Sequence, residues 1–305
     1  MARKHRFYLY FSVLICGILL NFWVKHDLEI IQFCRDTLQP AVEMQRRYAL
    51  RDQNIVLSLT TTPYRIDKLR PVLDSLYKQN IKISNIYLNL PYVFKRNNIP
   101  YQIPEWLQNE SRVTIIRSED YGPATKLLGT LQNVKLPANT IIITVDDDMY
   151  YPSNLVLHLA YDAKINPHSA VTLVGGDLAY DKNGKPRTSG LGFDLRFEPS
   201  VPVTAIMGYA GVAYRPEFFD EQIYALDKAP QECYMHDDLY ISFHLARRAV
   251  PRKNLSTRYV TEEEIKTNDE IARQPQALYI LTPNRANLSN VCLAHLRAIY
   301  PKVTF

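Results

Sequence analysis

Cysteine is scarce in this chain, with four among 305 residues. No two cysteines form a C-x-x-C pair, so neither a zinc ribbon nor a thioredoxin-like redox site is supported. Cys16 and Cys34 lie near the N-terminus, and only Cys233 and Cys292 fall in the main body of the chain. These last two could form one disulfide in an oxidising lumen, or they could be two unrelated buried thiols.

Strong net charge, internal repeats and low-complexity segments are also lacking. The formal net charge is +5, and Arg3, Lys4 and Arg6 supply three of these charges before any domain begins. Nucleic-acid-binding surfaces carry clustered lysines and arginines, so we expect no nucleic-acid partner. The composition, 47% hydrophobic and 22% charged, is that of a globular protein with a substantial core.

One long uncharged run occupies residues 7–24. As a helix with a rise of about 1.5 Å per residue it would be roughly 27 Å long, enough to cross the hydrocarbon core of a bilayer. The basic residues before it predict a cytoplasmic tail at 1–6 and place the rest of the chain across the membrane. A cleaved signal peptide is the alternative, although the run lacks a small-residue cleavage pattern. Residues 25–53 are expected to form a stem.

Strands and helices are expected to alternate from residue 54 onward. Apolar, β-branched segments bounded by turn residues predict the strands, and apolar residues at helical spacing predict the helices. The strands are predicted at 54–62, 83–90, 112–116 and 141–145, and the helices at 67–80 and 127–134. Short connections between alternating elements indicate an α/β fold with a mixed, mainly parallel central sheet flanked by helices, in one domain over 54–305.

The second half of the chain is less regular. A helix is predicted up to residue 164 and a strand at 170–175. Asn183-Gly184 is a hairpin-turn signal, so the topology is expected to become antiparallel there. Helices are predicted at 239–248 and 288–300, and a long loop at 251–276.

The strand at 141–145 runs directly into three consecutive aspartates at 146–148. Three like charges at the end of a buried strand are costly to desolvate without a cation, so a divalent metal site is one interpretation of the run, which the run alone does not decide. A solvated acidic turn is the alternative. Two further polar clusters, at 60–65 and 120–126, also follow predicted strands. Because ligands of parallel sheets bind beyond the carboxyl ends of the strands, this convergence favours the metal site.

The order of these clusters resembles that of the nucleotide-sugar glycosyltransferases with the GT-A fold. In that family an apolar strand ends in a D-x-D motif, which holds a divalent metal against the donor diphosphate, and the aspartates at 146–148 match it. The resemblance covers roughly residues 54–250 and implies Mn²⁺ or Mg²⁺ as the cofactor. It makes Asp148, with Asp146, a metal ligand, and it places Asp146 and Asp147 beside the nucleotide sugar.

The same resemblance assigns donor contacts to the two other clusters. It places Thr60, Thr61 and Arg65 against the base and diphosphate, with Tyr64 stacked on the base; a polar strand end with a packed Tyr64 is the alternative.

The turn at 120–126 offers one acid and one cation. By the resemblance, Asp120 contacts the nucleoside and Lys126 the phosphates. The alternative is a helix cap formed by Asp120, with Lys126 in solvent.

Asp237 and Asp238 precede the helix at 239–248 and resemble the acidic pair that the family places beside the acceptor. Asp238, or failing it Asp237, would take the proton of an acceptor hydroxyl as a general base. Helix-terminal acids stabilised by the macrodipole are the compatible alternative. The expected acceptor or sugar pocket contains Gly208, Tyr209 and Gly211. Weaker candidates for metal ligands are His236, His244 and His295.

These features predict transfer of a sugar from a UDP- or GDP-sugar donor to a hydroxyl of a glycan, protein or lipid. The tail, anchor, stem and body resemble the layout of Golgi glycosyltransferases. They predict a single-pass type II membrane protein, in the Golgi or endoplasmic reticulum of a eukaryote or in the inner or plasma membrane of another host. The alternatives are a metal-dependent phosphohydrolase or nucleotidyltransferase, and an inactive glycan-binding protein. Inversion or retention and the role of residues 251–305 are open.

Overall fold

The computed structural model describes residues 40–180, 186–190, 201–255, 265–273, 278–281 and 285–305. Residues Ala49–Phe305 form one compact unit. Residues 40–48 belong to a separate unit and are helical, with an ion pair of 2.9 Å between Arg47 and Glu43. No helix among the described residues is long and apolar enough to span a membrane. The predicted anchor at 7–24 lies outside these residues, as do the predicted tail and most of the stem.

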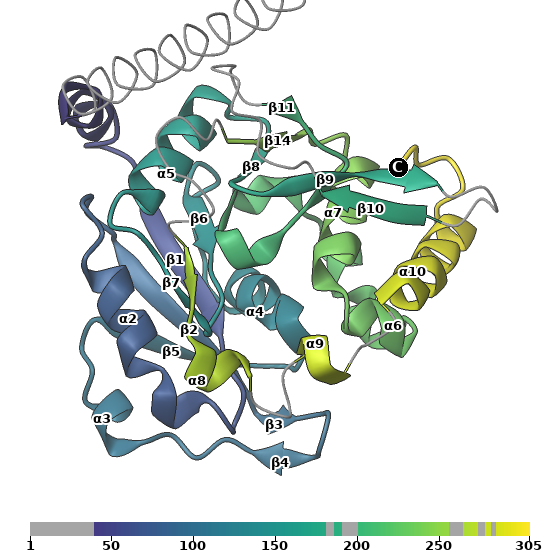
Figure 1. Cartoon of the computed structure of the whole chain (residues 1–305), viewed down its shortest axis with the longest axis horizontal. Helices are drawn as coiled ribbons and strands as arrows, with labels where there is room; N and C mark the ends of the chain where they lie inside the picture. Colours follow the sequence, from purple (N-terminus) through teal and green to yellow (C-terminus); the bar gives the residue numbers. More distant parts are fainter. Residues whose placement is uncertain (1–39, 181–185, 191–200, 256–264, 274–277, 282–284) are drawn as a thin grey trace, which may run out of the picture. The chain divides into compact units, whose positions relative to one another are not determined.

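An eight-stranded sheet forms the centre of the compact unit (Figure 1). Its strand order is β11-β14-β8-β13-β6-β1-β2-β5. All pairs from β6 to β5 are parallel, and β8 pairs in parallel with β14, whereas β13 and β11 run antiparallel to their neighbours. The mixed, mainly parallel sheet is therefore confirmed. The strands are β1 (Ile55–Thr60), β2 (Asn85–Pro91), β5 (Val113–Ser118), β6 (Ile141–Thr144), β8 (Ala170–Thr172), β11 (Val201–Pro202), β13 (Val212–Tyr214) and β14 (Arg252–Asn254).

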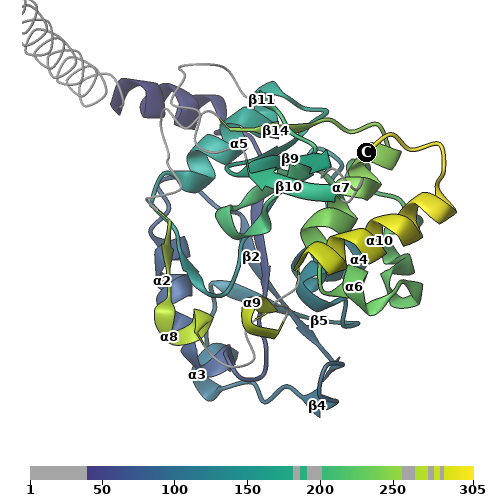
Figure 2. The ribbon, with the colours of Figure 1, turned by 45° about the vertical axis from the view of Figure 1, so that its right-hand side comes forward.

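The alternation of side chains along the strands builds two apolar cores, one on each face of the sheet. On β1, Leu57 and Leu59 belong to the core that α2 (Arg70–Tyr77) and α5 (Leu155–Ile165) cover. Val56 joins the other core, with α4 (Thr125–Asn133), α7 (Asp237–Arg247) and α10 (Arg285–Ile299). In both views α10 lies beside α6 (Gln231–Tyr234) and α7, away from α2 (Figures 1 and 2). The flanking helices are thus confirmed.

The second half of the chain departs in detail from the sequence prediction. The predicted hairpin is present as the antiparallel strands β9 (Gly175–Tyr180) and β10 (Pro186–Gly190). A third strand, β12 (Ala205–Ile206), pairs with the other side of β9. The long loop predicted at 251–276 is wrong, because β14, β15 (Lys266–Thr267) and α8 (Asp269–Ala272) occur there. These elements have two to four residues. They are too short for a periodic apolar pattern, and pairing with distant strands defines them.

A buried polar network lies between β1, β2 and α4. Asn89 donates to Ser58 Oγ at 3.0 Å and to the carbonyl of Leu59 at 3.1 Å, and its own Oδ1 accepts from Thr130 at 3.1 Å. Ser58 also donates to the carbonyl of Lys126. The folded protein loses stability when a buried polar group loses its hydrogen bond. This network therefore fixes the start of α4 against the end of β1.

Gly129 of α4 is required by this network. A Cβ at Gly129 would lie 2.6 Å from Asn89 Oδ1, which the network holds in place. Alanine normally favours a helix over glycine by about 1 kcal/mol. Here we expect Gly129→Ala to lower the free energy of unfolding by roughly 1–3 kcal/mol, measured by urea denaturation. Asp74→Ala at an exposed position of α2 is the matched control, and a gain in stability for Gly129→Ala would contradict the prediction.

Candidate functional site

A cavity of about 890 Å³ lies where β1 and β6 end. The structure brings most of the predicted site residues to its wall: Thr60, Thr61, Arg65, Asp120, Lys126, Asp146, Asp147, Asp148, Tyr209, Asp237 and Asp238. Tyr64, Gly208 and Gly211 are not part of the lining. Residues from both halves of the chain thus share one cavity at the carboxyl ends of parallel strands, where ligands of such sheets bind.

Arg65 organises the aspartates that follow β6. Its Nη1 atom lies 2.7 Å from Asp147 Oδ1 and 3.2 Å from Asp148 Oδ2. Thr61 donates to the other oxygen of Asp147 at 2.6 Å. Burial, followed by the neighbouring Asp147 and Asp146, raises the pKa of Asp148 to about 7. Asp147 is therefore compensated by internal contacts, whereas the negative charge of Asp148 is only partly compensated.

Lys126 connects the two acidic clusters. Its Nζ lies 2.7 Å from Asp146 Oδ1 and 3.1 Å from Asp237 Oδ2, and its side chain is 6% exposed. Burial alone would lower the pKa of Lys126, but Asp146, Asp237 and Asp238 raise it well above its usual value. Lys126 is therefore a buried cation at the centre of the site, and the alternative of a solvated Lys126 is wrong.

Asp238 lies in the first turn of α7, beside the backbone of Gly208. Its Oδ1 accepts the N–H of Gly208 at 2.9 Å. A Cβ at Gly208 would lie 2.7 Å from this oxygen and 2.8 Å from Lys126 Nζ, so a side chain there would displace the carboxylate or the amine. Burial, followed by the charge of Asp237, raises the pKa of Asp238 to about 8. The carboxyl group is thus oriented by a backbone donor and is unusually basic.

Asp120 holds three segments of the cavity wall together. It accepts the N–H groups of Lys95 and Gly122, each at 2.7 Å, and the hydroxyl of Tyr234 at 2.8 Å. Gly122 has φ +62°, and a Cβ there would lie 2.7 Å from the carbonyl oxygen of Tyr234. Both carboxyl oxygens of Asp120 are therefore engaged within the protein, and its predicted nucleoside contact stays a prediction.

Three predicted pocket residues have mainly structural contacts. Tyr64 packs edge-on against Phe94 and accepts a hydrogen bond of 2.8 Å from Asn97, in line with the packing alternative. Gly211 has φ +90° in the turn before β13, close to Leu159. Tyr209 lines the cavity, and its carbonyl accepts the hydroxyl of Tyr151 at 3.0 Å, which itself accepts the N–H of Asp146 at 2.7 Å.

The candidate histidines differ in position. His236 lines the cavity, whereas His244 and His295 do not. His244 is buried and packs at a tilt against Tyr240, with 4.5 Å between ring centroids, and burial lowers its pKa to about 3. His244 is therefore a core histidine, and the prediction that it could bind the metal is wrong.

Sequence reasoning missed two walls of the cavity. One is the hairpin of β3 (Val93–Phe94) and β4 (Ile99–Pro100), in which no site residue was predicted; this region supplies Phe94, Arg96 and Tyr101. The other is the C-terminal segment, whose β15 pairs with β7 (Met149–Tyr150) and whose Asn268 N–H donates to the carbonyl of Asp148 at 2.7 Å. The contributing residues of this segment are Thr267, Asp269, Ala272, Arg273, Leu278, Leu288 and Ser289. No motif marks either wall, and of these segments the sequence predicted only the helix that carries Leu288 and Ser289.

The acids fit a divalent cation that arrives with a phosphate ligand. No group of three or more His, Cys, Asp or Glu side chains in the described part of the chain forms a ready ligand set. Mg²⁺ and Mn²⁺ are commonly held by one or two protein carboxylates together with substrate phosphates, so such a set is not required. The pKa of Asp148 is raised because its charged form is buried beside Asp147 and Asp146 and only partly compensated, and a bound cation would complete the compensation. Asp146 and Asp148 are thus chemically suited to the role, and metal binding stays a prediction.

Comparison with solved structures finds distant likeness, with S. aureus TarS as one example. No family model and no curated protein matches the chain. The crystal structure of S. aureus TarS residues 1–349 in complex with UDP matches with 13% sequence identity and a TM-score of 0.39. The match covers 67% of this chain and 58% of the TarS chain, which is less than two thirds of its length. This likeness assigns neither a ligand nor an activity, and the GT-A resemblance stays a prediction.

The raised pKa of Asp238 predicts a pH-dependent cost in stability. Folded Asp238 holds its proton up to about pH 8, whereas the unfolded chain releases it near pH 4. Between these values the folded state binds more protons, so this group lowers stability as pH rises. In EDTA we expect Asp238→Asn to differ little from wild type in Tm at pH 4 and to exceed it increasingly up to pH 8. Asp74→Asn is the exposed control, and a difference independent of pH would contradict this assignment.

Proposed function

We propose that the chain is a metal-dependent glycosyltransferase that uses a nucleoside-diphosphate sugar, UDP- or GDP-linked, and a hydroxyl acceptor. The observation that carries the proposal is the convergence of two acidic clusters, Asp146–Asp148 and Asp237–Asp238, around Lys126 in one cavity. One cluster suits a metal diphosphate and the other suits proton removal. A glycosyl transfer from such a donor can use both functions side by side.

The donor half of the site would be formed by the ends of β1 and β6. Asp146 and Asp148 would hold Mn²⁺ or Mg²⁺, which when bound supplies charge stabilisation to the departing diphosphate. Arg65 and Thr61 fix Asp147, and through it the turn that carries both ligands. Lys126 would offer a positive charge to the phosphates from its position between Asp146 and Asp237.

The acceptor half would be formed by the first turn of α7. Asp238 is held by the N–H of Gly208, and its pKa of about 8 makes it a stronger base than an ordinary aspartate. General bases act best when their pKa lies near the working pH. Asp238 would take the proton of the acceptor hydroxyl, with Asp237 beside Lys126 as its partner acid.

Two features support a location on the far side of a membrane. The uncharged run at 7–24, preceded by Arg3, Lys4 and Arg6, supports a type II anchor. Cys233 and Cys292 form a disulfide, which persists in oxidising compartments. The proposed location is the Golgi or endoplasmic-reticulum lumen of a eukaryote, or the outer side of the plasma or inner membrane of another host.

Nucleotide binding is expected to require the metal. The full chain in detergent should bind UDP or GDP in calorimetry with Mn²⁺ or Mg²⁺, and EDTA should abolish the binding. Asp148→Asn should weaken it by at least about tenfold, because a charged ligand is lost. Since the pKa of Asp148 is about 7, affinity should also fall from pH 8 to pH 6 as protons compete with the metal. Metal-independent binding, or none to either nucleotide, would refute the donor site.

Removal of the base should separate binding from transfer. Asp238→Asn is expected to retain metal-dependent nucleotide binding and to lose sugar transfer by about 10²-fold or more, because the amide cannot accept the proton. The donor is first identified by hydrolysis of a panel of nucleotide sugars, and transfer is then measured on an acceptor panel. Full turnover of Asp238→Asn would refute the base assignment. A wild-type chain that hydrolyses the nucleotide sugar and transfers to no acceptor would favour the phosphohydrolase alternative.

A further inference from the structure

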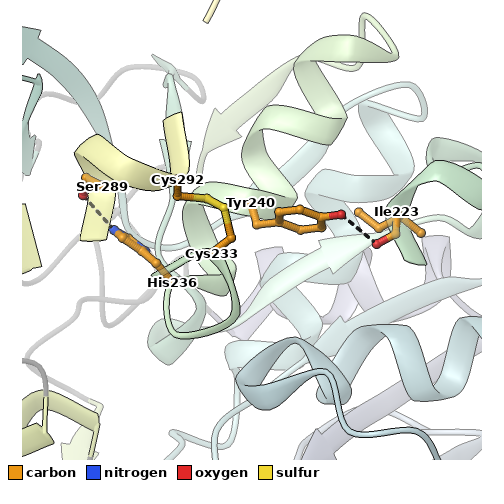
Figure 3. Close-up of a disulfide and its surroundings, with 6 residues drawn as sticks. All are labelled: Ile223, Cys233, His236, Tyr240, Ser289 and Cys292. Atoms are coloured by element: carbon orange, nitrogen blue, oxygen red, sulfur yellow. Dashed lines mark hydrogen bonds between the residues drawn. A yellow bond between two sulfur atoms is a disulfide. The ribbon is translucent and has the colours of Figure 1, made fainter. Parts of the chain in front are cut away.

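A disulfide joins two chain segments that border the end of the cavity with Asp237 and Asp238, here called the acidic end. Cys233 lies in α6 and Cys292 in α10, and the bridge spans 59 residues of sequence (Figure 3). Both cysteines are fully buried in the apolar core that also contains Leu239 and Leu296. The bridge is thus internal to the wall of the cavity and does not lie on an exposed loop.

A polar contact lies one helical turn away from the bridge on each side. His236 follows Cys233 by three residues, and Ser289 precedes Cys292 by three residues on α10. Residues three apart on a helix share one face, so Ser289 and Cys292 project to the same side of α10. His236 Nε2 lies 3.1 Å from Ser289 Oγ, and both residues line the cavity (Figure 3).

His236 is also the N-cap residue of α7 and directly precedes the helix. Its carbonyl accepts the N–H of Tyr240 at 3.2 Å, and Asp237 and Asp238 follow directly as the first residues of the helix. A shift of His236 would therefore move both acids relative to Gly208 and Lys126. Gly208 and Lys126 belong to other elements. The position of α7 therefore decides whether Asp238 reaches the N–H of Gly208 and Asp237 reaches the amine of Lys126.

We propose that the Cys233–Cys292 disulfide and the His236–Ser289 contact are a positioning clamp for the acidic end of the cavity. The bridge fixes α10 to α6, the histidine–serine contact carries this constraint to the start of α7, and Asp237 and Asp238 are held in place as a result. His236 and Ser289 are positioning residues in this scheme.

The clamp acts on one half of the cavity. Asp147 is fixed by Arg65 and Thr61, and Asp146 through its backbone N–H by Tyr151. These partners lie far in sequence from the bridge, in the segments that follow β1 and β7. Loss of the bridge is therefore expected to loosen the segment around Asp238 and to leave the segment around Asp147 unchanged.

Hydrogen exchange of the full chain in detergent tests the clamp without any ligand. In the double variant Cys233→Ala/Cys292→Ala, exchange at 235–241 and 286–292 should rise by about tenfold or more, with 141–148 and 70–77 unchanged. Leu76→Ala is the matched control, since it opens a cavity in the opposite core around a fully buried side chain. The proposal would be overturned if exchange were unchanged in the double variant. It would also be overturned if exchange rose equally in all four segments, as a general loss of stability would cause.

A second pair of variants keeps the disulfide intact. Ser289→Ala should reproduce the faster exchange at 235–241, and Ser289→Thr, which retains the hydroxyl, should restore wild-type exchange. The effect on turnover rests on the proposed function. In hydrolysis of the nucleotide sugar identified by the donor panel, Ser289→Ala should lower kcat about tenfold, with KM and the affinity for UDP and Mn²⁺ unchanged. Equal behaviour of the alanine and threonine variants would overturn the clamp. A chain that binds no nucleotide would refute the proposed function alone, because exchange still decides on the clamp.

Discussion

The arrangement of the site depends on an excess of partly buried carboxylates over cations. The clusters Asp146–Asp148 and Asp237–Asp238 bring five aspartates to the cavity wall, and Arg65 and Lys126 are the cations paired with them in the described part of the chain. The pKa of Asp148 and that of Asp238 are both raised, so the imbalance is concentrated at the two positions proposed for metal binding and proton transfer. Natural proteins tolerate such a cost in stability where function requires it.

Much of the scaffold could be predicted from the sequence because its central strands are mostly apolar and β-branched and alternate with helices. The segments at 54–62 and 141–145 have a buried pattern that few other structures accommodate, and they form β1 and β6. The polar residues that follow these strands could also be placed in one site. Neighbouring parallel strands have their carboxyl ends at the same edge of the sheet. The pairing of Lys126 with both acidic clusters could not be predicted, because it joins residues that are distant in sequence.

The unpredicted parts of the site are short elements defined by tertiary pairing. β15 has two residues and exists because it pairs with β7, directly after the acidic run. Asp120 was expected at a ligand, yet its oxygens connect Lys95, Gly122 and Tyr234. The disulfide was one of two open alternatives, since the distance between Cys233 and Cys292 depends on the packing of α6 against α10.

The bond from Asn268 N–H to the carbonyl of Asp148 has a consequence for biosynthesis. The chain emerges from the ribosome N-terminus first, and domains fold as their residues become available. The acid-bearing strand is complete early, but its partner strand, Lys266–Thr267, and Ser289, which faces His236, are made later. The cavity can therefore close only after Ser289 has been synthesised, so nascent chains that end before it would carry the acids without a formed site.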